Sequence, residues 1–236
     1  MREADRGLHA SKYDEEHAAR YFAHHDKNLR TRITTWRERK QLRRALADLG
    51  ALDSILDVPC GAGRFFSTLL EATAAMAKPT IIGADNSAAM LAIAAQSSGV
   101  KDGRVRLLET SVFALDLPDR SVDCVVCERF FHHLARAEDR RRVLAEIARV
   151  ARRGAVVSLW VDGNWQARRR AVRRRPADRD SSTDHREPTV GFGARCVVAR
   201  AAIERELASA GFEIVGRYDL WPGLSMWRRY ALRKRS

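Results

Sequence analysis

The chain is 236 residues long and carries 43 lysine and arginine residues against 30 aspartate and glutamate residues, a formal net charge of +13 at pH 7. This length suits a single α/β domain with its own core, and the absence of an apolar run of about 18 residues excludes a transmembrane helix. The polar N-terminus lacks the apolar region of a signal peptide, and the four cysteines come without a secretory signal, so we expect a cytoplasmic protein without a disulfide framework.

Residues 1–33 are polar with interspersed aromatic side chains, and we expect a helical or lid segment there. A single domain is predicted over residues 34–236. Its first helix is predicted over 34–49, because apolar residues recur at i, i+3, i+4 and i+7 from Leu42 onward.

Strands and helices then alternate along the chain. Apolar runs predict strands near residues 54–58, 80–84, 104–109, 122–127 and 154–161, with two final strands near 213–220 and 226–233. Amphipathic stretches predict helices near residues 64–77, 87–96, 137–152 and 199–210. This alternation predicts a parallel sheet covered on both faces, with ligand sites at the carboxyl ends of its strands.

Residues 162–198 interrupt the alternation and form a predicted basic loop insertion. Six arginines crowd its first half: Arg168, Arg169, Arg170, Arg173, Arg174 and Arg175. A helix in that first half is one alternative. Because the segment follows the fifth predicted strand, it can lie over the mouth of the site, where we expect it to recruit an anion.

A glycine turn follows the first predicted strand. Asp57 ends the strand, and Gly61 and Gly63 allow a ligand to approach the backbone closely. Asp85 lies 22 residues after Gly63, at the spacing from which a carboxylate reaches ribose hydroxyls. The carboxylate of Asp57 would repel a pyrophosphate, and Phe66 replaces the third glycine of the dinucleotide pattern. The pattern therefore favours a cation that bears a ribose, such as S-adenosylmethionine.

Four blocks of the sequence resemble the motifs of the class I S-adenosylmethionine-dependent methyltransferases, in the family's order. They are residues 57–63 (DVPCGAG), 82–91 (IGADNSAAML), 116–127 (DLPDRSVDCVVC) and 130–134 (FFHHL). The resemblance covers roughly residues 40–160. It implies a Rossmann-like, doubly wound, mostly parallel sheet of about seven strands with an N-terminal helical extension, and S-adenosylmethionine as cofactor.

The resemblance and the predicted strand ends also assign site residues. The predicted cofactor-binding residues are Asp57, Gly61, Gly63, Asp85, Asn86, Met90, Ser111, Val112 and Cys127. Pro59 stands where the family often has a glycine, so the turn must not use an N–H there. Ser111 stands where many members have an acid that contacts adenine.

His133 is the predicted general base, since an imidazole titrates near neutral pH and the family's histidine precedes the apolar residue that is Leu134 here. Packing or capping is the alternative role for His132 and His133. No metal site is predicted. Cys124 and Cys127 point to opposite faces of a predicted strand, which argues against a metal or disulfide pair.

The acceptor of the methyl group stays open. The positive charge favours an anionic partner, and we expect a small-molecule or lipid-like acceptor, with peripheral contact to an anionic membrane on its inner face. An RNA or protein methyltransferase is the alternative; Cys127-Glu128-Arg129-Phe130 replaces the asparagine-proline tetrapeptide used on exocyclic amines, which argues against base methylation. A non-catalytic cofactor-binding protein is a third reading. The oligomeric state is left open.

Overall fold

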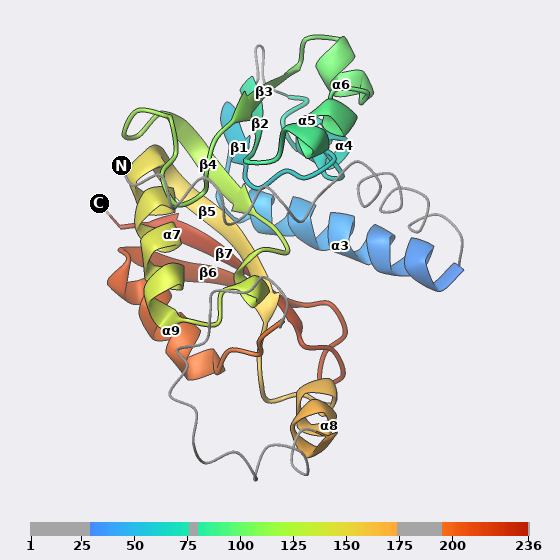
Figure 1. The fold of residues 1–236 in the computed structure, drawn as a ribbon, viewed down its shortest axis with the longest axis vertical. Coiled ribbons are helices and arrows are strands. Elements are labelled where there is room, and N and C mark those ends of the chain that lie inside the picture. Colours follow the sequence, from blue (N-terminus) through green and yellow to red (C-terminus); the bar gives the residue numbers. More distant parts are fainter. Residues whose placement is uncertain (1–28, 76–79, 174–194, 236) are drawn as a thin grey trace.

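The structure is a computed structural model that describes residues 29–75, 80–173 and 195–235. The predicted helical or lid segment lies outside these residues except for its last few positions. Residues 174–194 of the basic loop, with Arg174 and Arg175, also lie outside the described residues. Within them, one seven-stranded sheet runs through the molecule and helices cover both of its faces (Figure 1). This architecture confirms the predicted fold.

The strand order is β3-β2-β1-β4-β5-β7-β6. The strands are β1 (Ser54–Asp57), β2 (Thr80–Asp85), β3 (Val105–Glu109), β4 (Val122–Cys127), β5 (Ala151–Trp160), β6 (Phe212–Asp219) and β7 (Trp227–Lys234). Strands β1 to β5 pair in parallel, while β7 lies antiparallel between β5 and β6. The chain order reverses at β1 and β4, where doubly wound sheets open a crevice for ligands.

Helices cover both faces of the sheet, and α8 (Trp165–Arg173) lies apart from it (Figure 1). The other described helices are α3 (Leu29–Ala47), α4 (Phe66–Ala72), α5 (Ala88–Ala94), α6 (Ser98–Lys101), the 3-10 helix η1 (Phe131–His133), α7 (Ala137–Val150) and α9 (Arg200–Ser209). Side chains of α7 and α9 pack on one face of the sheet and those of α3, α4 and α5 on the other. In the part of the chain that the structure describes, no helix is long and apolar enough to cross a bilayer.

The central strands are apolar on both faces, as expected for a parallel sheet between two helical layers. In β4, Val125 and Cys127 join one core cluster while Cys124 and Val126 join the other. All four cysteines are free thiols. The alternation of β4 therefore places Cys124 and Cys127 on opposite faces, as predicted.

Several predicted boundaries are wrong. The helix predicted over 137–152 ends at Val150, because Ala151 is already extended with ψ at 133°. Arg152 then lies in β5, where it donates to the Asp123 carboxylate and the Ser54 hydroxyl at 2.9 and 2.8 Å. These bonds tie the start of β5 to its neighbours, so helix passes into strand with no loop between them.

Other helices differ in length from the prediction. Helix α4 covers only 66–72 of the predicted 64–77, because the chain turns at Thr73, whose hydroxyl donates to the Leu69 carbonyl at 3.0 Å. Helix α3 begins at Leu29 rather than at 34, and α6 has no counterpart in the prediction. The alternative of a helix early in the basic loop is confirmed by α8.

Candidate active site

Asp57 ends β1 at the point where the strand order reverses. Its side chain is 1 % exposed, and neither carboxylate oxygen has a hydrogen-bond partner among the described residues. Burial, and then the charges of Glu128 and Asp85, raise the pKa of Asp57 well above its usual value. A buried carboxylate without a partner is costly. The site is therefore suited to a ligand that brings a positive charge.

The turn after Asp57 is built on its two glycines. Gly61 and Gly63 adopt φ of +53° and +75°, which side chains rarely tolerate. The turn is held by N–H groups of residues other than Pro59, such as that of Cys60, which donates to the Ala84 carbonyl at 2.7 Å. Its backbone is thus fixed to β2 without the donor that proline lacks.

Phe66 explains the missing third glycine. A Cβ on Gly63 would lie 2.5 Å from the Phe66 ring, and one on Gly83 would lie 2.4 Å from it. A third glycine would allow the helix to lie close to the strand. Here the Phe66 ring at the start of α4 makes that contact, because it fills the space that Gly83 leaves on β2.

Asp85 ends β2 beside the glycine turn. One oxygen accepts from the Gly61 N–H at 2.8 Å and the other from the Ser87 N–H at 3.0 Å. Burial raises the pKa of Asp85, and these backbone N–H groups partly oppose the rise. Each oxygen keeps a second lone pair. Asp85 can therefore fix the turn and still accept from two ribose hydroxyls.

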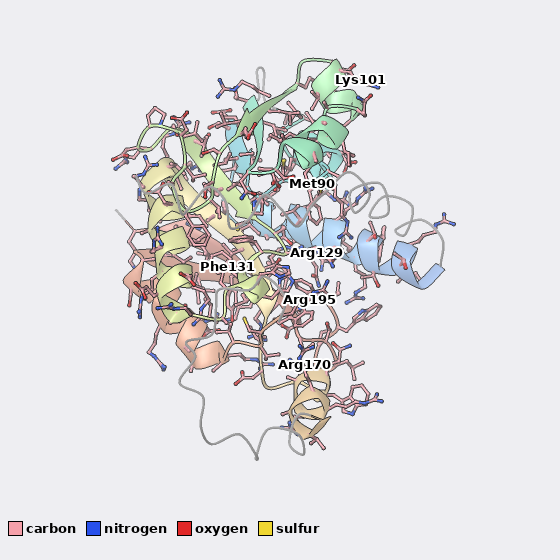
Figure 2. The ribbon with its side chains drawn as sticks, viewed as in Figure 1. Met90, Lys101, Arg129, Phe131, Arg170 and Arg195 are labelled. Carbon is pink, nitrogen blue, oxygen red and sulfur yellow. The ribbon has the colours of Figure 1, made fainter. Side chains whose placement is uncertain are left out.

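The start of α5 closes this side of the site. The Ser87 hydroxyl caps the helix by accepting from the Met90 N–H at 3.3 Å, while Asn86 is exposed. The Met90 side chain packs against Ala62, and a Cβ on Gly61 would lie 3.4 Å from its methyl group. Figure 2 shows Met90 on the side of the molecule where Arg129 also lies.

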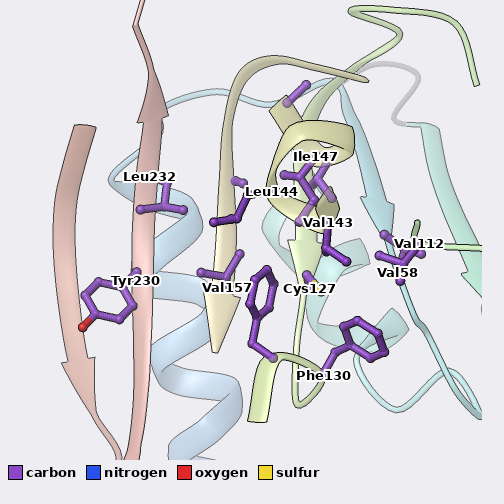
Figure 3. Packing of buried hydrophobic residues seen from close by; sticks show 14 of the residues in the cluster. Val58, Val112, Cys127, Phe130, Val143, Leu144, Ile147, Val157, Tyr230 and Leu232 are labelled. Carbon is purple, nitrogen blue, oxygen red and sulfur yellow. The ribbon is translucent and has the colours of Figure 1, made fainter. Parts of the chain in front are cut away.

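The predicted residues after β3 and β4 have different environments. The Ser111 hydroxyl accepts from the Phe113 N–H at 3.3 Å and keeps its own proton for a ligand. Val112 and Cys127 lie in the apolar core, as Figure 3 shows. Burial raises the pKa of the Cys127 thiol. The side chain of Cys127 thus faces core residues, and a ligand at the strand end would meet its backbone.

The two histidines of η1 lie side by side, with ring centroids 4.0 Å apart. His132 is buried and stacks on Trp160 at 5.1 Å. Burial, and then the charges of His133, Arg129 and Arg195, lower the pKa of His132 to about 2. His132 therefore stays neutral at physiological pH. His133 is half-buried and is the more accessible of the two side chains.

Two ion pairs and one cation–π contact at the site join residues far apart in the sequence. Glu38 of α3 is buried and binds Arg64 of the glycine turn and, at 3.1 Å, Arg129. Arg129 follows β4 with a left-handed φ of +58° and lies over the Trp227 ring at 4.9 Å. Helix α3 is thereby fastened to the ends of β1, β4 and β7. Such contacts leave no short-range signal in the sequence.

Glu128, another residue beyond β4, belongs to a buried pair. Arg229 of β7 donates to its two oxygens at 2.6 and 2.7 Å. Both side chains are nearly inaccessible to solvent. The Glu128 carboxylate is therefore paired with Arg229 of β7, whereas the Asp57 carboxylate has no partner among the described residues. Within the described residues, no group of three or more potential metal ligands occurs.

Comparison with known proteins agrees with this geometry. Residues 55–154 match the family model described as methyltransferase domain. Magnesium protoporphyrin IX methyltransferase from Synechocystis PCC 6803, solved with bound SAH, matches with a TM-score of 0.64 at 16 % identity, covering 92 % of each chain. A SAM-dependent methyltransferase from Aquifex aeolicus matches with a TM-score of 0.59 at 18 % identity, covering 94 % of this chain and all of that one (100 %). These structures share the fold.

A curated relative is the U6 snRNA (guanine-N(2))-methyltransferase THUMPD2 of Bos taurus, which is 28 % identical over 185 residues. The match covers 76 % of this chain but only 36 % of that protein. The chain thus spans about a third of the length of this relative. The matched family model places a methyltransferase domain over residues 55–154, and the strand order and the solved structures show the fold of the class I S-adenosylmethionine-dependent methyltransferases.

Proposed function

We propose that this methyltransferase acts on an anionic small-molecule or lipid-like acceptor, with the cofactor at the ends of β1 and β2. The observation that carries the cofactor site is the buried Asp57 carboxylate, which has no partner among the described residues. The positively charged amino group of S-adenosylmethionine would supply one. Asp85 would hold the ribose hydroxyls with the lone pairs that Gly61 and Ser87 leave free.

Arg64 offers a partner for the carboxylate at the same end of the cofactor. Its Nη2 binds Glu38, while its Nη1 is buried and has no acceptor within the described part of the chain. Because Arg64 directly follows Gly63, it shares the turn with the cofactor site. An acid on one side and an arginine on the other suit an amino acid group that carries both charges.

The chemistry needs few protein groups, because bound S-adenosylmethionine supplies an activated methyl group on a sulfonium. The acceptor's lone pair would form the new bond to the methyl carbon, and the sulfur would keep the electron pair of the broken carbon–sulfur bond. His133 would take the proton that the acceptor loses. The site residues would otherwise act by orienting the two reactants.

The acceptor class is supported by the charge and by α8. Residues Trp165, Arg168, Arg169 and Val172 follow an i, i+3, i+4, i+7 spacing and form one exposed stripe of this helix. Trp165 and Val172 are 54 % and 68 % exposed. Leu224, 57 % exposed, lies beside Trp165, since the Gly223 carbonyl accepts from the Trp165 N–H at 2.9 Å.

Exposed apolar side chains next to arginines suit the interface of an anionic membrane. We therefore place the protein in the cytoplasm, in peripheral contact with the inner face of such a membrane. RNA remains the alternative acceptor. Against base methylation, Glu128 and Arg129 are both committed to ion pairs at the position where an asparagine-proline tetrapeptide would lie.

Calorimetry tests the cofactor site. S-adenosylmethionine should bind the parent protein, and Asp85→Ala should weaken binding by about 2–3 kcal/mol, because charge-assisted hydrogen bonds to the ribose are lost. Asp85→Asn, which keeps one acceptor oxygen for the backbone, controls for damage to the turn. Unchanged affinity in Asp85→Ala, or tight binding of NAD by the parent, would contradict the assignment.

Transfer of a labelled methyl group tests the acceptor. Membrane lipid, small-molecule, RNA and protein fractions of a cell extract are incubated separately with the protein and labelled cofactor. Label in the anionic lipid or small-molecule fraction is the expected result. Label in RNA or protein would establish the alternative, and cofactor binding without transfer to any fraction would indicate a non-catalytic protein.

A further inference from the structure

A cluster of aromatic rings lies at the end of β5, on the far side of β4 from Asp57. Trp160 is buried; His132 stacks on it, and the Trp227 ring meets it edge to face with centroids 5.7 Å apart. Helix α8 closes over the cluster through Ala167, which packs with Trp160 and with Met226. This cluster adjoins the candidate base, because His133 follows His132.

Two arginines lie over the same tryptophan ring. The guanidinium carbons of Arg170 and Arg195 are 5.2 and 5.6 Å from the Trp160 ring. Arg170 also donates to the Arg195 carbonyl at 2.9 Å, which brings the two residues together. Neither guanidinium has an acidic partner within the described residues. Arg170 therefore points away from the exposed stripe of α8, although the sequence suggested one continuous basic run.

Two hydrogen-bond donors of this cluster have no acceptor in the part of the chain that the structure describes. The indole Nε1 of Trp160 and the Nε of Arg170 are buried, and the described residues offer neither of them an acceptor. Leaving a buried N–H unsatisfied costs about 1–3 kcal/mol. Two unsatisfied donors beside two guanidiniums that lack acidic partners form a donor set that matches the oxygens of a carboxylate or a phosphate.

The cluster and the cofactor site carry opposite charges. Asp57 and Asp85 make the ends of β1 and β2 negative, whereas Arg170 and Arg195 make the end of β5 positive. Figure 2 shows Arg129, Arg195 and Arg170 following one another from the end of β4 towards α8. A cationic methyl donor and an anionic acceptor would be drawn to neighbouring stretches of the same sheet edge, with η1 between them.

We infer that Arg170 and Arg195, together with the Trp160 indole N–H, bind the carboxylate or phosphate group of the methyl acceptor. This inference rests on the proposed function and names the residues that select its substrate. The anionic group would then lie at Trp160, separated from His133 by the ring of His132. The atom to be methylated would lie between the arginines and the cofactor.

Titration with simple anions tests the site without knowledge of the acceptor. The parent protein, saturated with S-adenosylhomocysteine and free of lipid, is titrated with inorganic phosphate and with benzoate by calorimetry at constant ionic strength. Saturable binding of at least one anion is expected. Arg195→Gln and Arg170→Gln should each weaken it at least tenfold, as the loss of a charge-assisted hydrogen bond implies.

The controls separate a specific site from general charge. Arg141→Gln removes the same charge from an exposed position of α7 and should bind the anion as the parent does. Arg195→Lys, which keeps the charge on an exposed side chain, should recover part of the affinity. Preference for phosphate or for benzoate distinguishes a phosphorylated acceptor from a carboxylate.

Two outcomes would overturn the inference: no saturable anion binding by the parent, or an equal loss in Arg141→Gln and Arg195→Gln. The affinity for S-adenosylhomocysteine, measured first in every sample, reports separately on the proposed function. If that affinity is normal while anions fail to bind, only the inference is wrong; if the cofactor product does not bind at all, the proposed cofactor site is wrong.

Discussion

At the scale of single residues, the two carboxylates of the cofactor site differ in the hydrogen bonds that they accept from the backbone. Asp85 accepts two backbone N–H groups, whereas Asp57, also buried, accepts none from the described residues. The protein without ligand therefore holds an ionisable group in an unfavourable environment. Binding of a cation at Asp57 would offset the free-energy cost of burying this carboxylate in the folded protein.

Asp57→Asn should accordingly stabilise the protein without ligand and weaken the binding of the cofactor. Since the folded state raises the pKa of Asp57, the folded chain holds this proton to higher pH than the unfolded chain does. Stability is then lost as pH rises from the usual pKa of the group through the raised one, by about 1.4 kcal/mol per unit of pKa difference. The asparagine variant should lack this loss.

Urea unfolding across a pH series, with calorimetry of S-adenosylmethionine at each pH, measures both effects. In the parent, affinity should rise with pH as Asp57 ionises; in Asp57→Asn it should be about 10- to 100-fold weaker and lack that rise. An asparagine variant that is less stable at high pH and binds the cofactor normally would show that Asp57 has a structural role only.

His133→Ala should lower kcat by about 10²-fold or more if His133 removes a proton from the acceptor, and should leave the affinity for the cofactor unchanged. The measurement is methyl transfer to the labelled fraction, followed across pH. Full activity at every pH from acid to neutral would mean that positioning of the reactants is sufficient for this enzyme.

At the scale of elements, the buried carboxylate of Glu38 joins helix α3 to two arginines of the site. Glu38→Gln should lower the free energy of unfolding by about 3 kcal/mol, because the substitution leaves Arg64 and Arg129 without their charged partner. Urea denaturation gives the value.

A control lies on the same helix. Arg43 pairs with Glu71 at 2.7 Å, but their side chains are 41 % and 57 % exposed. Arg43→Gln should therefore cost less than about 1 kcal/mol. Equal effects of the two substitutions would mean that Glu38 contributes no more than a surface pair does.

Sequence periodicity located every strand of the sheet but not every end of a helix. The apolar runs of β1, β2 and β4 are buried on both faces, so composition alone marks them. The end of α7 depends instead on Arg152 reaching Asp123 and Ser54 on other strands. A contact of that kind overrides local helix propensity and cannot be seen within a short window of sequence.

At the scale of the whole molecule, the net charge of +13 and the exposed stripe of α8 predict salt-sensitive binding to anionic membranes. Vesicles of phosphatidylcholine with phosphatidylglycerol should bind the parent at low salt and release it as salt rises. Arg168→Gln/Arg169→Gln should weaken binding by up to about 30-fold, since each arginine near the surface contributes about 1 kcal/mol.

The matched control for the vesicles removes two exposed arginines from α7. Arg141→Gln/Arg142→Gln changes the net charge by the same amount at a distance from the stripe. Co-sedimentation with the vesicles gives the affinities. If both double variants bind as the parent does, or both weaken equally, the stripe does not mark a membrane-binding face.

The site residues, like the elements of the fold, are of two kinds: those that local sequence features predict and those whose roles depend on distant partners. Asp57, Gly61, Gly63 and Asp85 could be predicted because a strand, a turn and their spacing are local features. Arg64, Glu38 and Arg229 could not, because their roles depend on partners up to 101 positions away. The contact of Arg170 could not be predicted for the same reason, because only the folded chain shows that it lies over Trp160.

The position of β7 has a consequence for how the protein is made. β7 (Trp227–Lys234) lies inside the sheet, next to β5, and supplies Arg229 to the buried pair with Glu128. A nascent chain on the ribosome cannot place Arg229 beside Glu128 until β7 has emerged, and until then the edge of β5 lacks the strand that pairs with it. Completion of the site therefore waits for a residue that lies 101 positions after Glu128 in the chain.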